Sequence, residues 1–281
     1  MFGDVDTTDP LAVQAAAQAA FAVMFPAADT AFIPRAFGWV TDAFAGRHPE
    51  YQAVDVAYHD LEHTMQGTLC LMRLLRGRHG AGVAPALTPE MVQLALLGML
   101  LHDTGYLKRR DDRSGTGAKY TRVHVRRSAD FAADLLAARG YAPAEVAAVR
   151  RMIACTGVDA PLAGIPFASE TERVAGLALG TADLLGQMAA PDYIERLPAL
   201  YRELAEAAQH APDRPNPAVW FSSAEELLRQ TPAFWASTRA RLDRDFAGLH
   251  RFLNDPFPDG PNPYLERIEA NMARARQLAP A

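Results

Sequence analysis

The sequence predicts an all-α protein, and three observations support this prediction. Apolar residues recur at three- and four-residue spacing through most of the 281 residues, which is the period of an amphipathic helix. Capping boxes, in which serine is followed three residues later by glutamate, stand at Ser169 and at Ser223. No stretch keeps the two-residue alternation of a half-buried β-strand. We therefore expect one all-α domain over residues 1–281.

The expected helices are separated by proline, by glycine and by capping residues. Pro26 lies between the first two helices, Thr88 and Pro89 begin the helix at the centre of the chain, and Gly105 is expected to end it. In chain order, the expected helices cover about residues 8–24, 30–45, 59–76, 89–104, 124–135, 144–156, 170–184, 193–210, 223–230, 232–254 and 264–278.

The composition is that of a soluble globular protein, with 49% hydrophobic and 22% charged residues. The formal charge of −5 argues against general nucleic-acid binding. No signal peptide or transmembrane run is apparent, and Cys70 and Cys155 lie outside any CxxC motif. The expectation is a cytoplasmic protein that does not bind membranes, with a homo-oligomer left open.

An unusual polar pair follows the most apolar predicted helix. The segment Leu94–Leu107 reads LALLGMLLHDTGYL, so the helix leads directly into His102 and Asp103. An imidazole and a carboxylate in such surroundings lose hydration and need a compensating partner, for which a metal ion is suited. The alternative is an ordinary helix-terminal polar pair that reaches solvent.

Two further segments carry candidate ligands. In YHDLEHT, His59 and His63 are four residues apart and would share one helical face. Asp183, in GTADLLGQM, lies inside an apolar helical pattern, where an unpaired carboxylate is costly. The alternatives are one surface and one hydrogen-bonded core histidine, and an aspartate that turns to solvent or caps a nearby backbone group.

His63, His102, Asp103 and Asp183 together offer two imidazole nitrogens and two carboxylates from three predicted helices. This donor set favours a borderline divalent ion over an all-oxygen site. We expect one or two ions, with Mn, Fe, Co, Ni or Zn preferred to Mg.

A basic segment follows the His–Asp pair. Eight of the 28 basic residues fall between Lys108 and Arg127, on a protein that is acidic overall. Lys119, Arg122 and His124 are the residues that we expect to bind a substrate phosphate beside the metal. A solvated loop is the alternative explanation of this charge.

The order of these motifs resembles that of the HD superfamily of metal-dependent phosphohydrolases, and YHDLEHT is similar to the YHNxxH motif of its cyclic-nucleotide phosphodiesterase branch. The similarity covers about residues 58–190. It implies an HD-domain helical bundle with its core at about 51–190 and helical additions at 1–50 and 191–281.

The resemblance also implies roles for individual residues. His63, His102, Asp103 and Asp183 would be the metal ligands, and Asp103 would bridge two ions if two bind. His59 would be the catalytic proton donor to the leaving oxygen, held protonated by a carboxylate from elsewhere in the fold.

The motifs and the resemblance together predict a divalent-metal-dependent phosphohydrolase. It would cleave a phosphate ester of nucleotide or phosphodiester type, in a small anionic phosphate-containing substrate, with a metal-activated water. Two alternatives remain at this stage. One is a non-haem di-iron oxygenase, and the other is a non-catalytic metal or nucleotide sensor.

Overall fold

The computed structural model of the protein describes residues 4–157, 160–210 and 221–279. These residues form α-helices and short 3₁₀ turns, and they contain no β-sheet, only an isolated bridge between Tyr51 and Arg109. The all-α prediction is therefore confirmed. The helices are α1 (Pro10–Met24), α2 (Phe32–Phe44), α3 (Leu61–Gly80), α4 (Pro89–Leu101), α5 (His124–Ala137), α6 (Pro143–Ile153), α7 (Glu170–Met188), α8 (Tyr193–Gln209), α9 (Ala224–Arg244) and α10 (Pro263–Leu278).

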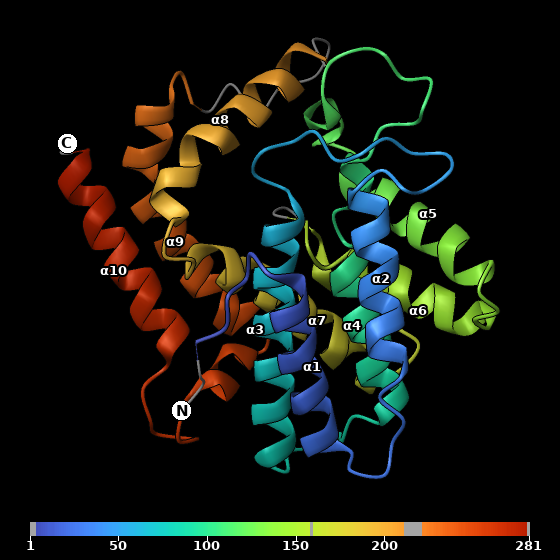
Figure 1. Ribbon diagram of the computed structural model, residues 1–281. Helices are drawn as coiled ribbons and strands as arrows, with labels where there is room; N and C mark the ends of the chain where they lie inside the picture. The colour runs from blue at the N-terminus through green and yellow to red at the C-terminus, as the bar shows by residue number, and fades with distance from the viewer. Residues whose placement is uncertain (1–3, 158–159, 211–220, 280–281) are drawn as a thin grey trace.

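Helices α3, α4 and α7 form the centre of the molecule (Figure 1). Helix α1 packs on α3 and α2 on α4, while α5 and α6 lie on one side and α8, α9 and α10 on the other. One apolar cluster runs through the whole arrangement, from Val13 on α1 to Ala275 on α10. No helix in the described ranges is both long and apolar enough to cross a membrane.

The close crossing of α3 and α7 depends on Gly186. A Cβ atom on Gly186 of α7 would lie 2.8 Å from the backbone of Gln66 on α3, closer than real Cβ atoms approach other atoms, so the two backbones can meet here only without that side chain. Gly67 lies at the same crossing, and a Cβ atom there would lie 2.8 Å from the sulfur of the Met99 side chain on α4. The crossing brings the first turn of α3 beside the middle of α7, where two of the candidate ligands lie.

The start of α3 differs from the prediction. The helix begins at Leu61, because the carboxylate of Asp60 accepts a hydrogen bond from the backbone N–H of His63 (2.9 Å) and so acts as the N-cap. His59 therefore precedes the helix. The sequence had suggested that His59 and His63 share one helical face, and the structure shows that they do not. Arg196 of α8 also contacts the Asp60 carboxylate, at 2.8 Å.

The predicted break between residues 230 and 232 is wrong, as is the predicted helix end at residue 254. Helix α9 continues through Pro232, because Leu227 and Trp235 on either side of it are buried in the core, and this burial offsets the hydrogen bond that proline cannot donate. The helix then ends at Arg244, and Ala247 and Gly248 take positive φ angles of 54° and 63°. A 3₁₀ turn, η5 (Leu249–Leu253), follows.

A pair of glycine-to-alanine substitutions tests the helix crossing. Gly186→Ala should lower the free energy of unfolding by about 1–3 kcal/mol, the usual range for overpacking, because the new methyl group overlaps the α3 backbone. Gly38→Ala on α2 meets no atom within 4 Å and should raise stability by about 0.5–1 kcal/mol through helix propensity. Urea unfolding measures both values. Equal effects at the two sites would show that the crossing tolerates a side chain.

Candidate metal centre

The structure brings together the four residues that the sequence predicted as metal ligands. His63 lies in the first turn of α3, His102 and Asp103 directly follow α4, and Asp183 lies inside α7. All four side chains are buried, with at most 6% of each residue exposed. The centre is thus built by three helices that pack on one another.

The four donor atoms alternate between nitrogen and oxygen. Nε2 of His63 lies 3.2 Å from Oδ2 of Asp103 and 3.3 Å from Oδ1 of Asp183. Nε2 of His102 lies at the same two distances from the same two oxygens. Each imidazole therefore faces both carboxylates, and each carboxylate faces both imidazoles.

These contacts do not satisfy the buried polar atoms. Nε2 of His102 and Oδ2 of Asp103 are fully buried and have no aligned hydrogen-bond partner among residues 4–157, 160–210 and 221–279, although they are close to each other. Protein–metal bonds of about 2.1 Å place neighbouring ligand atoms roughly 3.0–3.4 Å apart, which matches the four separations. His63, His102 and Asp103 form a buried group that can hold a metal ion, and the donor set fits a divalent one.

The pKa values of the group reflect strong mutual electrostatics. Burial by itself lowers the pKa of His63, but contacts with Asp103 and Asp183 outweigh it and raise that pKa to about 9. The pKa of His102 is raised by the same carboxylates against the effect of burial. The pKa values of Asp103 and Asp183 are held low by the histidines, although burial opposes this. Both carboxylates are therefore anionic at neutral pH, as metal ligands must be.

Hydrogen bonds outside the group orient its members. Nδ1 of His102 lies 2.7 Å from the carbonyl oxygen of Met99 and donates its N–H to it, so the ring is oriented with Nε2 toward the carboxylates. The amide of Gln187, one turn beyond Asp183, lies 3.4 Å from its Oδ1 atom and accepts a hydrogen bond from the Tyr58 hydroxyl (2.8 Å). Sequence analysis had not identified Tyr58 or Gln187 as part of the site.

Contrary to the sequence prediction, Gly105 does not end the central helix but has a different role. Helix α4 ends at Leu101, and Gly105 lies in the 3₁₀ turn η1 (Thr104–Tyr106). A Cβ atom on Gly105 would lie 2.1 Å from the carbonyl oxygen of His124, and its N–H donates to the Ser128 hydroxyl (2.8 Å). The missing side chain therefore lets the start of α5 approach the His–Asp pair.

His59 lies beside the four-residue group and is held by a carboxylate from a distant helix. Its Nδ1 atom is 2.6 Å from Oε2 of Glu203 on α8, and the other oxygen of Glu203 accepts the N–H of Tyr58 (2.5 Å). Burial favours the neutral acid, but the contact with His59 and these hydrogen bonds lower the pKa of Glu203. The prediction had required a carboxylate from elsewhere in the fold, and Glu203 is positioned for that role.

A stack of three rings connects His59 to the start of α5. The Tyr106 ring lies between His59 and His124, with centroids 4.5 Å and 4.7 Å apart. The Tyr106 hydroxyl is buried and has no well-aligned hydrogen-bond partner in the described part of the chain. Nδ1 of His124 lies 2.5 Å from the carbonyl oxygen of Thr121, and Nε2 is 3.8 Å from Oδ1 of Asp103. His124 thus faces the second oxygen of Asp103.

Much of the basic segment holds loops together. Lys108 pairs with Asp55 at 2.8 Å, and Arg127 donates to the carbonyl oxygens of Gly105 and Leu107, both at 2.7 Å. The ammonium group of Lys119 contacts Asp112 at 2.5 Å and both oxygens of Ser114. None of these described contacts of Lys119 reaches the four-residue group. Contacts within and between loops therefore account for Lys108, Arg127 and Lys119 in this basic segment, as the alternative explanation expected.

Arg122 lies half-buried between the 3₁₀ turn η2 (Gly117–Tyr120) and α5, two residues before His124. This placement does not test the predicted role of Arg122 in binding a substrate phosphate, which therefore stays a prediction. His124 is the one of the three predicted substrate-binding residues that has a described contact with the group.

Comparison with known proteins gives one family match. No curated protein matches the chain. A family model described as Npun_R2479-like matches residues 41–242, a region that contains the four candidate ligands, His59 and Glu203. Because this match covers well over half of the sequence, the chain belongs to the Npun_R2479-like family.

Proposed function

We propose that the protein is a divalent-metal-dependent phosphohydrolase of the HD type, acting on an ester in a small anionic phosphate-containing substrate. The observation that carries the proposal is the buried alternation of two imidazole nitrogens and two carboxylate oxygens at 3.2–3.3 Å. A structural ion pair would align its hydrogen bonds, whereas two of these atoms have no aligned hydrogen-bond partner among the described residues.

His63, His102, Asp103 and Asp183 would hold the ion. One carboxylate oxygen of Asp103 faces this group and the other faces His124 at 3.8 Å. A second ion would therefore find Asp103 as the shared ligand and His124 as a neighbouring donor. A bound divalent ion acidifies water to a nucleophile and neutralises charge that develops on a phosphoryl group.

His59 would supply the proton to the leaving oxygen. Glu203 fixes the proton-bearing Nδ1 of His59, so that the other ring nitrogen is the one available to a substrate. The His59 ring lies 5.3 Å from the His63 ring, within reach of an ester whose phosphate lies at the metal ligands. Glu203 is a positioning residue in this scheme, because it acts through His59.

The substrate would approach over His59 and His124. Their side chains are 16% and 19% exposed, whereas those of His63, His102, Asp103 and Asp183 are at most 8% exposed. The ring stack of His59, Tyr106 and His124 forms this more open side. Arg122 would add a positive charge near His124 for the substrate phosphate.

The first prediction concerns the metal. Protein purified without chelator should carry a divalent ion, and Asp103→Ala should lose it, because the substitution removes one of the two carboxylates that face both imidazoles. The affinity should fall by roughly tenfold or more, since even residues around metal ligands change affinity by that amount. Elemental analysis by mass spectrometry measures the content. Asp112→Asn, in the loop with Lys119, is the matched control and should retain the ion. Full occupancy in Asp103→Ala would exclude this site.

The second prediction concerns proton donation. His59→Ala should keep its metal and lose turnover by roughly a hundredfold or more, the usual scale for a missing general acid. The loss should be smaller for nitrophenyl esters, because nitrophenolate leaves without a proton. Steady-state kinetics with alkyl and nitrophenyl esters of the same phosphate measure the difference.

The same kinetics test the role of Glu203. Glu203→Gln should lower turnover on alkyl esters, and the double variant with His59→Ala should be no slower than His59→Ala alone, because both act in one step. Equal fractional losses on the two ester types, or metal loss in His59→Ala, would contradict the assignment of His59.

The third prediction concerns substrate binding. Arg122→Ala should raise KM for an anionic phosphate ester by roughly tenfold, the effect of losing one charge-assisted hydrogen bond, and should leave metal content unchanged. Arg126→Ala is the control, since this arginine is exposed in the first turn of α5. An unchanged KM in Arg122→Ala would assign the arginine to the loop alone.

A further inference from the structure

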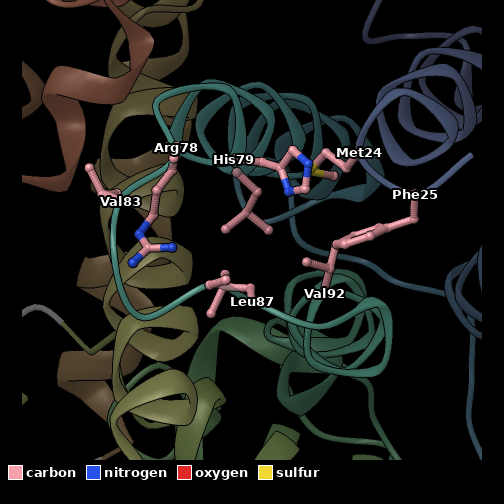
Figure 2. A pocket seen from close by; sticks show the side chains of 10 residues that line it. Met24, Phe25, Arg78, His79, Val83, Leu87 and Val92 are labelled. Carbon is pink, nitrogen blue, oxygen red and sulfur yellow. The ribbon is translucent and has the colours of Figure 1, made fainter.

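A cavity lies at the other end of α3 from the candidate metal centre, between the end of α1, the end of α3 and the start of α4. Its volume is about 240 Å³. Most of the residues that line it are apolar, and none of the described ones is acidic: Met24, Phe25, Leu75, Arg78, His79, Gly82, Val83, Ala86, Leu87 and Val92. Figure 2 shows the guanidinium group of Arg78 between Val83 and Leu87, with His79 and Phe25 across the opening.

Arg78 is the unusual member of this lining. Only 4% of the residue is exposed, although arginine is almost never buried without a partner. Its described hydrogen bond runs to the carbonyl oxygen of Pro85 at 2.8 Å, and no carboxylate of the described residues pairs with it. Guanidinium cannot shed its proton, so the charge remains in the apolar cavity.

The backbone neutralises this charge only in part. Arg78 lies in the last turn of α3, where the helix dipole is equivalent to roughly half a negative charge. One neutral carbonyl oxygen adds a single hydrogen bond, while a guanidinium group has five N–H donors. An anion within the cavity would complete the compensation.

We propose that this cavity binds a small apolar carboxylate, with the carboxylate on Arg78 and the hydrocarbon part against Met24, Leu87 and Val92. A planar carboxylate matches the fork of guanidinium donors, and the surrounding side chains favour a hydrocarbon body. The cavity of about 240 Å³ is several times the roughly 30 Å³ that one liquid water molecule takes, so it has room for a short-chain carboxylate such as hexanoate. This site is separate from the metal centre and does not depend on the proposed function.

Hexanoate titration, followed through the methyl signal of Met24, tests the proposal. Met24 lines the cavity, whereas Met99 lies beside Gly67 near the metal centre, so the two methyl signals distinguish the two places. Hexanoate should shift the Met24 signal saturably and leave the Met99 signal unchanged. Hexanol, which has the same chain without the charge, should bind at least tenfold more weakly.

Three variants identify the groups responsible. Arg78→Met keeps a long side chain but removes its charge, and it should weaken hexanoate binding tenfold or more. Arg76→Met lies outside the cavity lining and should leave hexanoate binding unchanged. Ala86→Trp retains Arg78 but fills the mouth of the cavity, and it should also abolish binding. Thermal unfolding confirms that each variant is folded.

Two results would overturn the proposal. One is the absence of a saturable shift of the Met24 signal in the folded wild type at hexanoate concentrations up to about 10 mM. A dissociation constant of that size already corresponds to weak binding. The other is equal affinity in wild type and Arg78→Met, which would place the carboxylate elsewhere, including on a metal ion.

Discussion

The loss of hydration at two carboxylates and two imidazoles is the constraint on which this structure depends. Asp103 and Asp183 lie among apolar helices, and leaving either charge unpaired there would cost several kcal/mol. Both carboxylates face both histidines, which compensates their buried charge. This arrangement requires α3, α4 and α7 to meet at one point. The packing of the three central helices and the chemistry of the site are therefore one arrangement.

Small residues make that meeting possible. Gly67 and Gly186 let α3, α4 and α7 approach where His63 and Asp183 must face each other, and Gly105 lets α5 approach the His–Asp pair. In each case a methyl group would overlap a neighbouring atom, most severely at Gly105, where the neighbour is a backbone oxygen at 2.1 Å. These glycines allow the helix separations that set the distances between the candidate ligands, a role beyond the usual one of glycine in turns. A change at them would disturb the centre without touching a ligand.

The sequence predicted what depends on local periodicity and on burial. The helices follow from apolar spacing, and Asp183 stood out because a carboxylate inside an apolar helix needs a partner. The start of α3 was misplaced because Asp60 looked like part of the helix and is instead its cap. Glu203 could be predicted only in kind, since it is 144 residues from His59 and no local pattern links them. The sequence left two explanations of the charge near Lys119 open for the same reason, because its contacts with Asp112 and Ser114 appear only in the folded chain.

Helix α8 connects the region after residue 190 to the candidate site. Glu203 holds His59, Arg196 contacts the Asp60 cap of α3, and Glu206 accepts hydrogen bonds from the N–H and hydroxyl of Thr116, at 2.5 and 2.6 Å. One helix thus fixes the candidate proton donor, the start of the helix that carries His63, and the loop that leads to His124. The candidate metal ligands come from α3, α7 and the end of α4, so α8 contributes none of them. In the proposed mechanism α8 would position the proton donor through Glu203, and all of α8 lies within the part of the chain that the family match covers, residues 41–242.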